Sequence, residues 1–66
     1  MKNRLRVARA ELDITQEELA KRIGVSRQTI NAVESGKYVP STVLALKMAK
    51  VFDKKVEEIF MLEDED

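Results

Sequence analysis

Polar side chains suited to paired hydrogen bonds gather on one predicted helix in the middle of this 66-residue chain. Ile30 and Val33 mark the buried face of that helix, because they are three residues apart. Arg27, Gln28 and Asn31 then lie on its outward face. A guanidinium can pair with two acceptors on one base edge, and a carboxamide with a donor and an acceptor on another. This face lacks the acid–base pairs of an ordinary solvated helix, so it favours recognition by hydrogen bonding.

Groups for covalent or acid–base catalysis are scarce. The chain has no histidine and no cysteine, which removes the commonest general base and the usual thiolate and imidazole metal ligands. The carboxylate pairs Glu17–Glu18 and Glu57–Glu58 are adjacent in predicted helices, so each pair diverges. We therefore expect a protein that is not an enzyme and that needs no metal or other cofactor.

Length and hydropathy limit the architecture. A chain of 66 residues allows one domain, near the lower limit for a core that is stable alone. The longest wholly apolar run covers about four residues, too few to cross a membrane. The amino-terminal segment alternates charged and aliphatic residues and lacks the apolar region of a signal peptide. We expect a soluble cytoplasmic protein.

Charge is balanced overall but unevenly distributed. Residues 1–55 contain all 12 basic residues and 6 of the acids, a net charge of +6, whereas residues 56–66 contain 6 acids and no base. A basic body with an acidic end suits a surface that meets phosphate on one side. A solubilising tail on an ordinary mixed surface explains the same distribution, so charge alone does not decide between the two.

Hydrophobic periodicity predicts the elements that position the polar face. The expected helices cover residues 3–12, 16–23, 27–35, 42–52 and 56–60. In the first helix the expected inward stripe is Leu5, Ala8 and Leu12. In the fourth it is Leu46, Ala49 and Phe52, flanked by Val43 and Met48.

The segment between residues 15 and 26 carries the signals of two helices joined by a tight turn. Thr15 with Glu18 three residues later is typical of a capping box at the start of the second helix. Gly24 suits the left-handed conformation that ends it, and Ser26 is the next N-cap. Asp53, which tolerates positive φ, is expected to end the fourth helix.

These residues form a motif that resembles a known family. TQEELA at 15–20, GVS at 24–26, Ile30, VESGK at 33–37 and PS at 40–41 together resemble the Cro/cI-type helix-turn-helix family, the XRE family of prokaryotic and phage regulators. The likeness covers the chain to about Phe60. The final VEEIFML and the size are similar to the short dimeric members of that family.

The resemblance implies an all-α fold of five helices, the lambda-repressor-like DNA-binding domain. It places a single domain at residues 1–62, the helix-turn-helix at 16–35 and an acidic frayed tail at 63–66. The short members also suggest a strand pair between Met1–Asn3 and the carboxyl-terminal segment at a dimer interface.

The implied function is sequence-specific binding of double-stranded DNA by a transcriptional regulator, expected to be a repressor, with helix 27–35 in the major groove. The expected base-reading residues are Arg27, Gln28, Asn31 and Ala32. The expected contacts to the DNA backbone come from Gln16, Ser26, Thr29, Ser35, Lys37 and Tyr38. Arg9 and Glu34 occupy family positions that form a partly buried structural ion pair between the first and third helices.

A homodimer on a palindromic operator is expected, because one recognition helix reads only about four base pairs. The apolar run of Ile59, Phe60, Met61 and Leu62 is the candidate dimer contact. After the DNA-binding domain no room remains for an effector domain, so we expect no small-molecule effector.

One alternative stays open. A protein-interaction module, such as an antitoxin or a coactivator, can use the same fold without reading DNA. Its mark would be an acidic or apolar face on the third helix, and Arg27, Gln28 and Asn31 argue against it.

Overall fold

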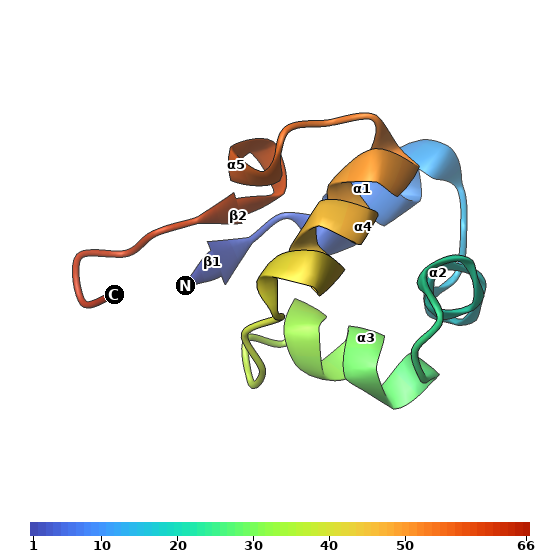
Figure 1. Ribbon diagram of the computed structural model, residues 1–66, viewed down its shortest axis with the longest axis horizontal. Helices are drawn as coiled ribbons and strands as arrows, with labels where there is room; N and C mark the ends of the chain where they lie inside the picture. The colour runs from blue at the N-terminus through green and yellow to red at the C-terminus, as the bar shows by residue number, and fades with distance from the viewer.

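The computed structural model describes all 66 residues and consists of five helices and one two-stranded sheet, confirming the predicted fold class (Figure 1). In chain order the elements are β1 (Lys2–Asn3), α1 (Leu5–Leu12), α2 (Gln16–Ile23), α3 (Arg27–Glu34), α4 (Thr42–Phe52), α5 (Val56–Ile59) and β2 (Phe60–Met61). None of the helices combines the length and the apolar character that crossing a bilayer requires.

The sheet joins the two ends of the chain. β1 runs antiparallel to β2, with Lys2 opposite Met61 and Asn3 opposite Phe60, and Figure 1 shows both strands on the same side of the molecule. The predicted strand pair thus forms within one chain. The first helix begins at Leu5, later than predicted, because Asn3 belongs to the strand and its Oδ1 accepts a hydrogen bond from the Leu5 amide at 3.1 Å.

The core consists of apolar side chains from all five helices and from β2. Thirteen residues are buried and none of them is polar or charged. They are Leu5, Ala8, Leu19, Ala20, Ile23, Ile30, Val33, Leu44, Met48, Ala49, Phe52, Ile59 and Phe60. Burial of apolar surface is therefore the main stabilising term of this small domain.

Two inward positions were predicted wrongly. Leu46 is 56% exposed, whereas Leu44, which the periodicity did not select, and Met48, which was expected as a flank, are buried. Leu46 is two residues from each of them, or about 200° around the helix, so the two sets cannot face the same side. Leu12 is 43% exposed, because it lies in the last turn of α1, directly before Asp13 ends the helix in the left-handed conformation.

Candidate nucleic-acid interface

The turn between α2 and α3 is built by local hydrogen bonds. Thr15 Oγ1 accepts from the Glu18 amide at 3.0 Å, and Ser26 Oγ accepts from the Thr29 amide at 3.2 Å, so both residues are the predicted N-caps. Gly24 ends α2 with φ of 78°, a left-handed conformation that favours glycine. The second half of the capping box does not form, because the Glu18 carboxylate accepts from Arg22 Nε at 2.9 Å instead.

The buried faces of α2 and α3 fix how the second of these helices is presented. Ala20 in α2 is small and only 3% exposed, and Ile30 and Val33 fill the inner side of α3. Figure 1 shows α3 along one edge of the molecule, with α2 near its amino-terminal end. The opposite side of α3 is therefore left to the solvent.

That outward side carries the predicted base-reading residues. Arg27, Gln28 and Asn31 are exposed, and their side chains form no hydrogen bond or ion pair within the chain. Ala32 is half-buried beside them. The arrangement leaves a guanidinium and two carboxamides free to bind a partner.

The predicted backbone-binding residues differ in their local partners. Lys37 and Tyr38 are exposed in the loop after α3, and their side chains are unpaired. The hydroxyls of Ser26 and Thr29 lie 3.0 Å apart at the start of α3, and Ser35 Oγ donates to the Ala32 carbonyl at 3.2 Å.

Gln16 lies beside the end of α3, although it opens α2. Its Nε2 donates to Glu34 Oε1 at 3.1 Å, which leaves the second amide hydrogen and the carbonyl oxygen of the side chain unused. Gln16 therefore lies close to the carboxyl-terminal end of α3, whereas Arg27 is exposed at the amino-terminal end of the same helix.

Glu34 and Arg9 form a two-pronged ion pair. Arg9 Nε lies 2.7 Å from Glu34 Oε2, and Arg9 Nη2 donates to Glu34 Oε1 at 3.2 Å. The Glu34 side chain is 1% exposed and that of Arg9 is 18% exposed. Arg9 Nη1 also donates to the Ile14 carbonyl at 3.0 Å, so one side chain connects α1, the following linker and α3.

The charge state of Glu34 follows from these contacts. Burial alone would raise the pKa of its carboxyl, but hydrogen bonds from Arg9 and Gln16, together with the charge of Arg9, outweigh burial. The pKa of Glu34 is therefore held below its ordinary value. A fully ionised Glu34 faces inward and adds no exposed negative charge to α3.

Two side-chain contacts to the end of α3, from Asn3 and from Arg6, were not predicted from the sequence. Asn3 Nδ2 donates to the Val33 carbonyl at 2.9 Å, which ties β1 to the end of α3. Arg6 Nε lies 3.5 Å from Glu34 Oε1. Arg6 is three residues before Arg9 and shares a helix face with it, a spacing that could have indicated its role. No local signal identified Asn3.

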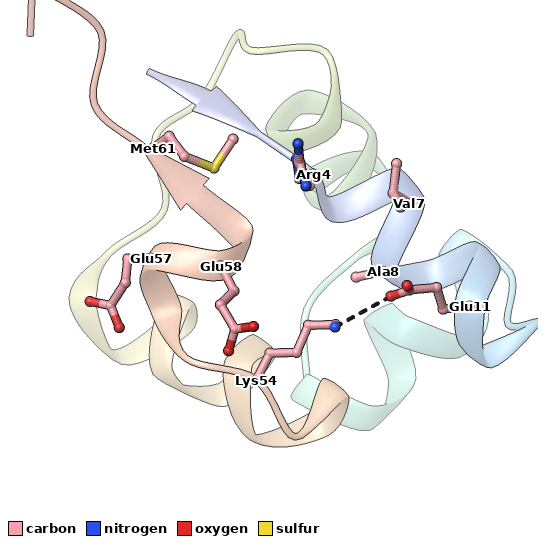
Figure 2. Close-up of a pocket in the computed structure, with 8 residues that line it drawn as sticks. All are labelled: Arg4, Val7, Ala8, Glu11, Lys54, Glu57, Glu58 and Met61. Carbon is pink, nitrogen blue, oxygen red and sulfur yellow. Dashed lines mark ion pairs between the residues drawn. The ribbon is translucent and has the colours of Figure 1, made fainter.

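The structure also has a polar cleft away from α3. Figure 2 shows it between α1 and the α5–β2 segment, with a volume of about 320 Å³. The Lys54 ammonium reaches across to Glu11 at 3.5 Å, and Glu57, Glu58 and Arg4 are on the lining. None of the predicted DNA-contacting residues belongs to this cleft, whereas Met61, a residue of the expected dimer contact, lines it.

The fold and the exposed face of α3 define a helix-turn-helix DNA-binding domain of the lambda-repressor-like class. The chain belongs to the helix-turn-helix family of XRE type, whose family model matches residues 5–59. The predicted resemblance is confirmed, and the protein is a helix-turn-helix transcriptional regulator.

Relatives in archaea and bacteria match this chain over nearly its whole length. The uncharacterized HTH-type transcriptional regulator MJ0272 of Methanocaldococcus jannaschii is 58% identical over 66 residues, covering 100% of both chains. The uncharacterized HTH-type transcriptional regulator YgzD of Bacillus subtilis is 49% identical over 65 residues, covering 98% of each.

Solved structures share the fold. The P22 c2 repressor protein, in complex with a synthetic operator, superposes with a TM-score of 0.78 at 30% identity over 82% of each chain. The restriction-modification controller protein C.AhdI from Aeromonas hydrophila superposes with a TM-score of 0.79 at 37% identity over 86% of each chain.

Proposed function

We propose that the protein binds double-stranded DNA sequence-specifically as a homodimer and acts in the cytoplasm as a transcriptional repressor, with α3 in the major groove. The observation that carries this proposal is the outward face of α3. Arg27, Gln28 and Asn31 are exposed and unpaired there. The single acid of the helix, Glu34, is turned inward, and its negative charge is balanced by Arg9. Such a face offers donors and acceptors to base edges and no charge that repels phosphate.

Each exposed side chain of α3 has a chemical match on DNA. Arg27 pairs with O6 and N7 of guanine, and Gln28 pairs with N6 and N7 of adenine; each pair discriminates by about 1–3 kcal/mol. Asn31, one turn further along, contacts the next base or its phosphate, and Ala32 meets a thymine methyl group. The start of α3 therefore specifies the site.

Groups on either side of α3 hold the DNA backbone in this proposal. Lys37 and Tyr38 are exposed and have unused donors in the loop after the helix. Gln16 has one amide hydrogen left for a phosphate, since Glu34 occupies the other. Ser26, Thr29 and Ser35 contribute hydroxyls that are already oriented by local contacts. Contacts of this kind fix the register of a protein on DNA without specifying sequence.

Two copies are needed because one α3 covers only about four base pairs. A two-fold dimer places the second α3 on a half-site one helical turn away, about 34–36 Å, so the operator is palindromic. The function needs no small-molecule effector, and repression follows from occupation of the operator. The P22 c2 repressor, which shares this fold, is a repressor seen with an operator.

Selection of bound sites from a random duplex pool tests the proposal directly. We expect a palindromic site with half-sites one turn apart, bound by the wild-type protein in a gel-shift assay. Failure to retain any duplex even at low salt would overturn DNA binding, since phosphate contacts dominate affinity there. That result would favour the protein-interaction alternative.

Arg27→Ala on the selected site tests the role of α3. We expect at least a tenfold loss of affinity and relaxed preference at one base pair of each half-site, the size expected for a lost bidentate pair. Lys50→Ala is the matched control, because it removes the same charge from an exposed position on α4 outside the interface. Equal losses in both variants would show that only charge, and no base contact, is involved.

A further inference from the structure

One carboxylate oxygen at the end of α3 is surrounded by donors from two other helices. Glu34 Oε1 accepts hydrogen bonds from Arg9 Nη2 at 3.2 Å and from Gln16 Nε2 at 3.1 Å, and Arg6 Nε lies 3.5 Å from it. Arg6 and Arg9 belong to α1, and Gln16 begins α2. Side chains from three helices therefore meet at a single atom.

This cluster contains two guanidinium groups but only one carboxylate. Arg9 already balances the charge of Glu34, because its Nε lies 2.7 Å from Glu34 Oε2 and its side chain is only 18% exposed. Arg6 forms no ion pair with any other acid of the chain. The cluster therefore carries an excess positive charge, and that charge belongs to Arg6.

Arg6 is held far more loosely than Arg9. Its side chain is 75% exposed, and it approaches Glu34 through Nε alone, at 3.5 Å. Both of its Nη nitrogens make no hydrogen bond within the chain. An exposed ion pair of this kind adds little to stability. Arg6 is therefore not required to hold α1 against α3, and its Nη groups are available to a partner.

Gln16 places another free donor beside Arg6. Its Nε2 and Arg6 Nε lie 3.1 and 3.5 Å from the same oxygen atom, so the two nitrogens are close neighbours. One amide hydrogen of Gln16 is unused, as are the Nη hydrogens of Arg6. Positively charged donors of this kind match an anion with several acceptor oxygens, and guanidinium groups often bind phosphate through two hydrogen bonds.

The position of the cluster along α3 fits a phosphate of the DNA backbone. The 8 residues of α3 extend over about 12 Å, which is comparable to the width of the major groove. In the proposed complex Arg27, at the start of the helix, contacts base edges. Groups beside Glu34, at the other end, are then within reach of the phosphates that border the groove.

We propose that Arg6 and Gln16 together bind one phosphate of the DNA backbone, while Glu34 holds both donors in place. The inference rests on the proposed function and adds to Gln16 a charged partner from α1. Arg9 takes no part in the contact, because all three of its nitrogens already donate within the chain. A contact to phosphate strengthens binding to every sequence and selects none.

The salt dependence of DNA binding tests the role of Arg6. Each neutralised phosphate adds about 0.9 to the slope of log K against log salt concentration. We expect Arg6→Gln to reduce that slope by about 0.9 for each bound copy of the chain. Its affinity at low salt should fall by the same factor on selected and on random duplex. Fluorescence anisotropy at a series of salt concentrations measures both quantities.

Lys54→Gln is the matched control for the loss of charge. The Lys54 ammonium also lies 3.5 Å from a single carboxylate, that of Glu11, but in the cleft away from α3 (Figure 2). Its slope should equal that of the wild type. An unchanged slope for Arg6→Gln, or equal reductions in both variants, overturns the proposal. Circular dichroism should show that Arg6→Gln unfolds at the wild-type temperature, and a large decrease would assign Arg6 to the fold instead.

Duplexes with one uncharged phosphate identify the group that is bound. A methylphosphonate replaces one charged oxygen by a methyl group, at one position of the selected duplex at a time. We expect one position in each half-site at which the wild type loses affinity, whereas Arg6→Gln and Gln16→Ala do not. Different positions for these two variants would contradict a shared phosphate.

Failure of this inference and failure of the proposed function give different results. A wild type that binds the selected duplex, together with an unchanged slope for Arg6→Gln, refutes the contact and leaves the function intact. A wild type that retains no duplex at low salt refutes the function itself, and the contact with it.

Discussion

At the level of single residues, Glu34 has the most consequential environment. Its carboxylate is 1% exposed and accepts hydrogen bonds from Arg9 and Gln16, with Arg6 nearby. A buried charge is tolerated only when it is paired and hydrogen-bonded, and Arg9 supplies both conditions. The same carboxylate orients Gln16, so a structural pair also prepares a side chain proposed to contact phosphate.

Removal of Arg9 should therefore be costly. Arg9→Met leaves Glu34 buried without its main partner, and we expect a loss of about 3 kcal/mol in the free energy of unfolding. Urea denaturation followed by circular dichroism measures it. The control is Arg22→Met, which breaks the half-exposed pair with Glu18 and should cost less than about 1 kcal/mol. An unchanged midpoint for Arg9→Met would contradict the structural role of the pair.

The lowered pKa of Glu34 predicts how stability depends on pH. A carboxyl whose pKa is lower in the folded than in the unfolded chain contributes stability above its unfolded pKa, near 4.5. That contribution is lost as the pH falls through the folded pKa. We expect the wild type to lose more stability on acidification below pH 4.5 than Glu34→Gln does. Parallel acid-unfolding curves for the two proteins would argue against this charge state.

At the level of elements, the chain begins and ends its helices largely as local chemistry predicts. Thr15 and Ser26 cap their helices, and Gly24 and Asp53 adopt left-handed conformations at helix ends. These features depend on neighbours within four residues, which is why sequence alone could predict them.

Features that depend on distant partners were harder to predict. The periodicity predicts Leu46 on the inward face of α4, because several aliphatic residues of this helix are candidates for that face. Only packing against the other helices decides that Leu44 and Met48 are buried. Asn3 falls both in the predicted first helix and in the strand pair that the resemblance implies, and the periodicity alone cannot choose between them because its partners Phe60 and Val33 are remote in the chain. The positions of the exposed α3 residues follow from local periodicity. The hydrogen bond from Gln16 to Glu34 does not, because the two residues lie in different helices.

The turn between α2 and α3 allows a test that separates conformation from packing. A Cβ at residue 24 would meet nothing within 4 Å, yet φ is 78° there. Gly24→Ala should therefore destabilise the protein by about 1–2 kcal/mol through backbone strain alone. Thermal unfolding measures this, and Gly24→Asn should restore part of the loss, since Asn tolerates the left-handed conformation. Equal effects of Ala and Asn would contradict a conformational cause.

At the level of the whole molecule, charge is divided between a basic body and an acidic end. Glu63 and Asp66 pair with the amino group of Met1, while Asp64 and Glu65 are exposed and make no ion pair. In the proposed complex their charges repel DNA of any sequence, which limits non-specific association.

Neutralising Asp64 and Glu65 should therefore change the affinity for DNA without changing the preference for particular bases. We expect Asp64→Asn with Glu65→Gln to strengthen binding to random duplex at low salt by a few-fold, with the gain fading as salt screens the charges. Fluorescence anisotropy on random and selected duplexes measures both. A changed base preference would show that the tail takes part in recognition.

The joining of the chain ends also has a consequence for biosynthesis. The Arg4 amide donates to the Ile59 carbonyl at 2.7 Å, and β1 has no strand partner until Phe60 and Met61 have been added. A nascent polypeptide still emerging from the ribosome therefore lacks the segment that completes its core and braces Asn3 against α3. The protein therefore has to fold into its DNA-binding form after that segment has been synthesised. We expect the regulator to bind its operator only after translation has passed Phe60 and Met61.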